Sequence, residues 1–364
     1  MNPVQLLTSV IETIPKKIES VKWKPFSRLF IVKDSSNWVV SWETHEIAAI
    51  CDKLQIHSVC KVSHRYFSRQ CVFFSNRHFL LQDDWLKLRH RIATPYYHGK
   101  PGTGYAEFDR IYNKFCKYHV HIERIQVTNT EMRDIILASG INPDKVFLIP
   151  IGINLNYFSF RSINSQTEAR RKWDIPETAF VVGSFQKDGN GWKDGNTPKL
   201  IKGPDIFIKA LSLLKKSVPE LLVLLSGPAR GYVINELIKH GIQYRHIYLD
   251  NYPDIVSLYH VLDVYVISSR QEGGPKAILE SMATGVPLVT TRVGQAIDLV
   301  EHEKNGWMVD VSDHEALAHW IEHVYRNINS LYLILKKGRR TAELNSYAAQ
   351  VPLWSEFMYD FVMR

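Results

Sequence analysis

Short apolar runs alternate along this chain with longer stretches in which apolar residues recur every three or four positions. The short runs are rich in β-branched and aromatic residues and are typical of buried strands, whereas the longer stretches are typical of helices that bury one face. Such alternation indicates an α/β layer fold. In the first half it predicts strands at 27–32, 71–74, 92–97, 125–128 and 146–149, and helices at 43–54, 106–118 and 130–138.

A second series of the same kind begins at Phe180. Before it, around 154–167, the apolar periodicity lapses into polar residues that suit an interdomain linker. We therefore expect two α/β domains with a cleft between them, at 1–160 and 168–335, followed by a helical region at 336–364. The second series predicts strands at 180–184, 221–226, 246–249, 263–268 and 286–291, and helices at 205–217, 233–240, 255–262, 314–326 and within 331–364.

The length of 364 residues is enough for two domains with sizeable cores, and the composition is that of an ordinary globular protein rich in aromatic residues. No apolar run reaches the roughly 18 residues of a membrane span, and no signal peptide is expected. The first 18 residues predict an amphipathic helix, which leaves contact with a membrane surface open. The four cysteines show neither C-x-x-C pairing nor zinc spacing, so a reducing cytoplasm is the simplest location.

The net charge of +8 lies wholly in the first half of the chain. Residues 1–165 carry 22 Lys and Arg against 14 Asp and Glu, whereas the remaining residues carry 23 of each. A solvated basic face explains this distribution as well as an anionic partner does. The functional alternatives are the inner face of an anionic membrane, an anionic acceptor or a nucleic acid. No recognition module of interleaved aromatic and basic residues is visible, so nucleic acid is the least expected partner.

The segment between the last two predicted strands carries the most specific chemistry. Glu272 and Glu280 stand eight residues apart around a Gly273-Gly274-Pro275 corner. Pro275 suits the first position of a helix, where its missing N–H costs nothing, and Gly285 suits the left-handed residue just past a helix end. The pattern is a strand, a glycine turn, a short helix and a strand, which is one βαβ unit of a parallel sheet.

The turn of this βαβ unit is suited to phosphate and sugar. Ligands of parallel sheets bind beyond the carboxyl ends of the strands, where the turn lies. Free N–H groups at the start of the helix attract a phosphate, and a carboxylate can accept hydrogen bonds from both hydroxyls of a ribose. The segment therefore predicts a sugar-nucleotide site. The plainer alternative is that Glu280 is a surface residue paired with Lys276, four positions earlier.

These residues resemble a known family. The pattern Ser269-x-x-Glu272-Gly-Gly-Pro-x-x-x-x-Glu280 is similar to the E-x7-E signature of glycosyltransferase family 4, whose members have the GT-B fold of two Rossmann-like domains. The resemblance extends over most of the carboxyl half and implies a C-terminal helix that packs back on the amino-terminal domain. Further matches to the family are Lys202-Gly203, Ser226-Gly227-Pro228, Asn305-Gly306, Val127-Thr-Asn-Thr130 and Leu148-Ile-Pro-Ile-Gly-Ile-Asn154.

The resemblance implies a glycosyltransferase that takes a nucleotide-diphosphate sugar as co-substrate, retains the anomeric configuration, and needs neither a cofactor nor a metal. Glu272 would contact the hydroxyls of the donor sugar beside the Gly273-Gly274-Pro275 backbone, and Glu280 would hold the ribose. Lys202 and a second cation would bind the diphosphate, in line with the stabilisation of a leaving group by fixed charges. A glycan, lipid-linked or small-molecule acceptor would bind the basic amino-terminal domain, and Leu249–Tyr252 would meet the base, mostly through backbone.

The chain departs from the family at two places. Many members have an Arg just before the Lys-Gly pair, but here the loop after Gly183 is lengthened and contains two copies of Lys-Asp-Gly-Asn, at 187–190 and 193–196. Lys187 or Lys199 would have to replace that Arg, and the sequence does not choose between them. The turn at 33–38, on the acceptor side, lacks the glycine that many members have there.

The best candidate for catalysis on the acceptor side is His98, which follows a predicted strand and resembles a strand-end His-Gly of the family. It would position the donor sugar or assist proton transfer, or else be a hydrogen-bonded structural histidine. His119 and His121 alternate on a predicted strand, but no further ligand lies at metal spacing. No Asp-x-Asp occurs, which weighs against the glycosyltransferase architecture that binds a divalent metal through that pair.

Three rival functions remain at this point. A GT-B sugar-nucleotide epimerase would share the donor site. A catalytically silent carbohydrate-binding relative would share the fold, but the intact pair of glutamates speaks against it. A nucleic-acid-binding protein would use the basic half, and it predicts binding that weakens steeply with salt.

Overall fold

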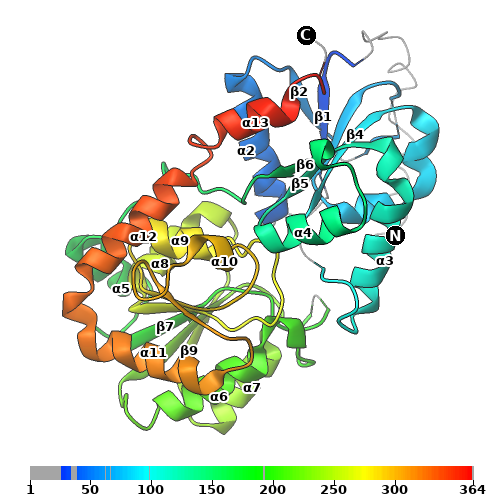
Figure 1. The fold of residues 1–364 in the computed structure, drawn as a ribbon. Helices are drawn as coiled ribbons and strands as arrows, with labels where there is room; N and C mark the ends of the chain where they lie inside the picture. The colour runs from blue at the N-terminus through cyan, green and yellow to red at the C-terminus, as the bar shows by residue number, and fades with distance from the viewer. Residues whose placement is uncertain are drawn as a thin grey trace, which may run out of the picture.

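The computed structural model describes residues 26–33, 39–61, 63–65, 67–97, 99–191 and 193–362. Over these residues the chain forms two parallel six-stranded sheets, each flanked by helices (Figure 1). We call the part around the first sheet the amino-terminal domain and the part around the second the carboxyl-terminal domain. The expected α/β fold of two Rossmann-like domains is confirmed.

The first sheet has the strand order β2-β1-β3-β4-β5-β6. Along β1 the side chains alternate between two clusters, with Phe30 and Val32 on one face and Leu29 and Ile31 on the other. Both faces are therefore covered, which is why the strand is a continuous apolar run. The elements of this domain are β1 (Leu29–Val32), α2 (Val39–Lys53), β2 (Ser58–Lys61), β3 (Cys71–Phe74), β4 (Arg91–Tyr96), α3 (Ala106–Tyr118), β5 (Ile122–Val127), α4 (Thr130–Ala138) and β6 (Val146–Leu148).

The second sheet has the strand order β12-β11-β10-β7-β8-β9. The order reverses between β7 and β10, so the crevice beyond their carboxyl ends is where a ligand of such a sheet binds. The strands are β7 (Phe180–Ser184), β8 (Leu221–Ser226), β9 (Gln243–Ile247), β10 (Val264–Ile267), β11 (Leu288–Thr291) and β12 (Trp307–Val309); the helices are α5 (Ile163–Lys172), α6 (Pro204–Leu214), α7 (Gly231–Lys239), α8 (Ile255–Val261), α9 (Ala277–Thr284), α10 (Ala296–Leu299) and α11 (His314–Asn327).

The carboxyl terminus crosses back to the first domain, as the family resemblance implied. Helix α12 (Tyr332–Leu344) packs on α9 of the carboxyl-terminal domain, and α13 (Val351–Met358) lies on the amino-terminal domain (Figure 1). Trp354 and Phe357 of α13 belong to the same buried cluster as Leu29 of β1. The Cys71 thiol donates to the carbonyl of Phe361 at 2.9 Å, which holds the residue after α13 and its turn against β3.

Several local expectations were wrong. His119–His121 is a 3₁₀ turn and not a strand, so the two histidines do not share a strand face. The expected linker becomes helix α5 at Ile163, where Ser162 and Ser165 form a reciprocal capping box. This helix was missed because only Ala169 and Arg170 of it are buried, which leaves little apolar periodicity to detect. Strands β2 and β12, and the short α10, were also missed.

The expected amphipathic helix at 1–18 and most of the turn at 33–38 lie outside the described residues. In the part of the chain that is described, no helix is long and apolar enough to cross a membrane. The domain boundaries that the sequence predicts, at 160, 168 and 335, stay predictions.

Candidate functional site

The Glu272–Glu280 segment lies where the second sheet changes direction. Glu272 follows β10, and the loop that begins at Gln186 follows β7, so the two loops leave neighbouring strands at the same edge. The side chain of Gln186 joins these loops, because its Nε2 donates to the carbonyl of Lys202 at 3.1 Å and its Oε1 lies 3.5 Å from Ser269 Oγ. The loops that carry Lys202 and Glu272 are thus joined at the topological switch point.

Glu272 is held by a cation and a hydroxyl. Lys202 Nζ donates to Glu272 Oε1 at 2.5 Å, and Ser269 Oγ donates to the same oxygen at 2.9 Å. Lys202 ends a 3₁₀ turn (Leu200–Lys202) that leads into α6. The structure therefore brings together two residues that the sequence had assigned to neighbouring groups of one donor. Both contacts use Oε1, and Oε2 of Glu272 has no hydrogen-bond partner among the described residues, so it can accept from hydroxyls of a ligand.

Glu280 is buried and bonded to two phenols. Tyr252 donates to its Oε1 and Tyr259 donates to its Oε2, the latter at 2.8 Å. Glu280 is only 4% exposed, which rules out the alternative of a surface residue paired with Lys276. Burial raises the pKa of Glu280, although the phenols and Lys276 act in the opposite direction. Burial also raises the pKa of both tyrosines far above 10.0, so they remain protonated donors at neutral pH.

Lys276 contacts the amino-terminal domain instead of Glu280. Its Nζ lies 3.3 Å from Glu43 Oε2 on α2 and 3.0 Å from the hydroxyl of Tyr347, which itself donates to Glu43 Oε2 at 2.5 Å. Its ammonium group also lies 5.1 Å from the centre of the Tyr252 ring. A buried cation on the glutamate segment is thus neutralised by the other domain.

The glycine corner also meets the amino-terminal domain. Asn129 caps α4 through its side-chain oxygen, and its Nδ2 donates to the carbonyl of Gly273 at 2.5 Å. The backbone of Gly274 approaches Ile151 closely, since a Cβ on Gly274 would lie 2.9 Å from Ile151 Cδ1. Pro275 lies two residues before the first helical residue of α9, and not at its first position as expected. The two domains therefore touch at the corner itself.

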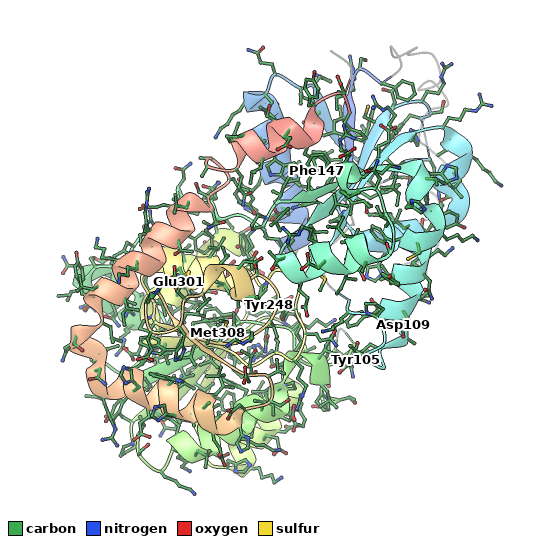
Figure 2. The ribbon with its side chains drawn as sticks, in the orientation of Figure 1. Tyr105, Asp109, Phe147, Tyr248, Glu301 and Met308 are labelled. Carbon is green, nitrogen blue, oxygen red and sulfur yellow. The ribbon has the colours of Figure 1, made fainter. Side chains whose placement is uncertain are left out.

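Lys187 and Lys199 lie at the two ends of the inserted loop. Burial lowers the pKa of both. The pKa of Lys199 is lowered further by repulsion from Lys202 and Lys187 and is raised by Glu272. Glu107, in the first turn of α3 between the labelled Tyr105 and Asp109 of Figure 2, also raises the pKa of Lys199.

His98 lies outside the described residues, so its expected role stays a prediction. Sequence reasoning missed Asn129, Tyr259 and the Glu43–Lys276 contact. Asn129 had a detectable signal, because Asn before a helix is an N-cap, but its second contact with Gly273 depends on the domain arrangement. Among the described residues, no group of three or more His, Cys, Asp or Glu side chains is placed to hold a metal ion.

The arrangement of two Rossmann-like domains is that of the GT-B fold. The structure is similar to that of Anabaena HepE in complex with UDP-glucose, with a TM-score of 0.73 and 16% identity over 92% of this chain and 99% of that one. It is also similar to a glycosyltransferase from Rickettsia africae, with a TM-score of 0.68 and 17% identity over 94% and 100% of the two chains.

Residues 198–340 match the family described as glycosyl transferases group 1. Among curated proteins, D-inositol 3-phosphate glycosyltransferase of Corynebacterium urealyticum is 27% identical over 52% of this chain and 45% of its own length. The capsular polysaccharide biosynthesis glycosyltransferase CapM of Staphylococcus aureus is 31% identical over 30% and 29%. The chain spans about half the length of the first such relatives, at 45% and 46%. Residues 198–340 are therefore a glycosyl transferases group 1 domain within a GT-B fold.

Proposed function

We propose that this protein is a retaining glycosyltransferase that moves a sugar from a nucleoside diphosphate sugar to a hydroxyl group of an acceptor. The observation that carries the proposal is the Lys202–Glu272 ion pair at the switch point of the second sheet, eight residues before the buried Glu280. A cation for phosphate, a carboxylate for sugar hydroxyls and a carboxylate for ribose lie within one group 1 domain.

Each residue of the site has a role in this proposal. Lys202, with Lys187 and Lys199, binds the diphosphate and stabilises the charge that develops as it leaves. Oε2 of Glu272 accepts from the donor sugar beside the backbone of Gly273, Gly274 and Pro275. Each oxygen of Glu280 accepts one phenolic hydrogen bond and has a second lone pair for a ribose hydroxyl. We take UDP-glucose as the first donor to test, since the similar Anabaena structure contains it.

The reaction is a displacement in which the acceptor hydroxyl attacks on the face that the diphosphate leaves, through an oxocarbenium-like state. The C–O bond to the diphosphate breaks as the new glycosidic bond forms, and the hydroxyl proton passes to the departing phosphate oxygen. His98 positions the donor sugar or assists this proton transfer. No metal and no cofactor takes part in this scheme.

The acceptor binds the amino-terminal domain, which carries the excess of positive charge. Glycans, lipid-linked sugars and polyol phosphates have the required hydroxyls, and the last two are anionic or reside at membranes. Similarity to an inositol 3-phosphate glycosyltransferase supports an anionic acceptor, and similarity to a capsular polysaccharide enzyme supports a glycan. We place the protein in the cytoplasm, in peripheral contact with the inner face of the membrane.

The test is a thermal-shift screen of the purified chain against UDP-, GDP- and ADP-sugars, followed by transfer assays with the sugars that bind. One class of donor should raise the melting temperature, because a ligand that binds only the folded state stabilises it. The wild type should transfer sugar and Glu272→Gln should transfer it about 10²–10³-fold more slowly. Binding of no donor by the wild type would overturn the proposal. Conversion of the donor into an altered nucleotide sugar, without a glycoside, would favour an epimerase instead.

A further inference from the structure

The two Lys-Asp-Gly-Asn copies form a folded hairpin with two different contacts. Its two sides pair antiparallel, since Gly189 bridges Pro198 and the Lys199 N–H donates to the Asp188 carbonyl at 2.7 Å. The second copy covers the start of α7, where the N–H groups of Gly231 and Tyr232 donate to the carbonyls of Asp194 and Gly195. A Cβ on Gly195 would lie 2.3 Å from the carbonyl oxygen of Ala229. The insertion is therefore a folded and integral part of the carboxyl-terminal domain.

Asp188 of the first copy and Arg230 of the domain form the most deeply buried ion pair of the described residues. Asp188 Oδ1 lies 3.0 Å from Arg230 Nε, and both side chains are fully buried. Arg230 also donates to the carbonyls of Ser184 and Ser226, at the carboxyl ends of β7 and β8. Arg230 thus ties the base of the hairpin to the edge of the sheet where the donor site lies. A buried ion pair adds little stability over a well-packed apolar pair, so its presence here calls for a positional reason.

The hairpin base adjoins the proposed diphosphate site. Asp188 directly follows Lys187 in the chain, on one side of the hairpin base. Its backbone carbonyl accepts from the N–H of Lys199 on the other side. The Lys202 N–H in turn donates to the carbonyl of Lys199 at 2.8 Å. Displacement of Asp188 would therefore move two lysines relative to Lys202, even though neither Asp188 nor Arg230 can reach a ligand.

We propose that Asp188 and Arg230 are positioning residues, which hold Lys187 and Lys199 beside Lys202 so that the three lysines together bind the diphosphate of the donor. This inference rests on the proposed function and makes the insertion the replacement for the Arg that many family members carry. Both lysines take part in that replacement, and Lys199 is the one fixed most directly by the backbone of Asp188.

The chain offers a matched control in the same domain. Arg170 Nη2 and Asp263 Oδ2 form a second buried ion pair, 2.7 Å apart. Asp263 precedes β10 and therefore lies at the opposite edge of the sheet from the donor site. Asp263→Asn and Asp188→Asn both leave a buried arginine with a neutral partner, so both should lower the melting temperature. Only the second should affect recognition of phosphate.

The experiment measures binding of UDP and UMP to the full chain by calorimetry at a temperature where each variant is folded; GDP and GMP replace them if the screen selects guanosine donors. Asp188→Asn should weaken UDP binding about tenfold and UMP binding less than twofold, because the lost contacts are charge-assisted bonds to the second phosphate. Lys199→Met, a change at the edge of the hairpin that leaves the fold intact, should likewise lower the preference for UDP over UMP. In the Lys199→Met background, Asp188→Asn should weaken UDP binding by clearly less than the tenfold expected in the wild type, because part of the effect of Asp188 passes through Lys199 and only the part through Lys187 is left.

The outcomes separate this inference from the function on which it rests. An unchanged ratio of UMP to UDP dissociation constants in Asp188→Asn, or an equal change in Asp263→Asn, would overturn the inference alone. Fully additive effects of Asp188→Asn and Lys199→Met would also overturn it. A wild type that binds none of UDP, GDP and ADP would overturn the proposed function and the inference with it.

Discussion

The two ends of the Glu272–Glu280 segment are built for different tasks. At the first end, Glu272 is bonded through one oxygen only, by Lys202 and Ser269, next to the amino-terminal domain. At the other end, Glu280 has a phenol on each oxygen and lies inside the carboxyl-terminal domain. One short segment therefore carries a loop carboxylate, Glu272, whose charge faces a lysine, and a helix carboxylate, Glu280, whose charge is costly because it is buried. Glu272 suits contact with the part of the ligand that reacts, and Glu280 suits recognition of the part that does not.

The largest effect is expected at the first end. Glu272→Gln keeps the shape of the side chain and removes its charge, so it should lower kcat by about 10²–10³-fold, as loss of a charge-stabilising group does in other enzymes. Steady-state kinetics with the donor that the screen identifies measures this. Glu301→Gln is the control, since Glu301 forms an exposed ion pair with Lys304 at 2.8 Å. Equal losses in the two variants would contradict the distinct role of Glu272.

The middle of the segment should matter for stability. Lys276→Met removes the cation that neutralises Glu43, both being about 6% exposed, and should lower the free energy of unfolding by about 3–5 kcal/mol. Urea denaturation measures this loss. Adding Glu43→Gln should restore much of it, because no buried charge is then left unpaired. If Lys276→Met alone is neutral, the contact between the domains does not carry the stability assigned to it.

At the second end, the substitution Glu280→Gln should stabilise the folded protein by an amount that depends on pH. Burial raises the pKa of Glu280 above 4.5, so the folded state holds the proton more tightly than the unfolded state does, and ionisation opposes folding as pH rises above 4.5. Glu280→Gln cannot ionise, and the tyrosine hydroxyls can rotate to suit the amide. Its melting temperature should exceed that of the wild type at pH 7, and the gap should close towards pH 4. A gap that widens on acidification would contradict the sign of the shift.

The smallest effect is expected where the corner meets the other domain. Asn129→Ala removes both an N-cap and the hydrogen bond to Gly273, and should cost about 1 kcal/mol of stability and weaken donor binding only a few-fold. Asn142→Ala removes a cap of the same domain, where Asn142 Oδ1 accepts from the Asp144 N–H, and should cost stability alone. Calorimetric donor binding to both variants measures the difference. Equal donor affinities would show that the Gly273 contact does not shape the site.

The sequence was most informative where apolar runs are long and turns are marked by glycine. Strands β3, β7 and β8 and helices α3 and α4 have the predicted bounds, because each is an apolar or amphipathic run with clear ends. The resemblance to the E-x7-E signature assigned Glu272 and Lys202 to one site, and the structure places these two residues in contact. The partners of the buried charges in this segment were not predictable, because Tyr252, Tyr259 and Glu43 are distant in sequence and only the packing of helices brings them together. Helix α5 was missed because it buries so few residues.

The most direct test of the two-ended site is to compare UDP with UDP-glucose, or the corresponding pair for the donor that binds, in Glu272→Gln and Glu280→Gln. Calorimetry should show that Glu272→Gln weakens the nucleotide sugar but leaves UDP binding unchanged or stronger, since Lys202 is released from its partner. Glu280→Gln should weaken both ligands by the same factor, because both contain the ribose. Equal weakening of UDP and UDP-glucose in Glu272→Gln, or no effect of Glu280→Gln on either ligand, would contradict this assignment of sugar and ribose to the two glutamates.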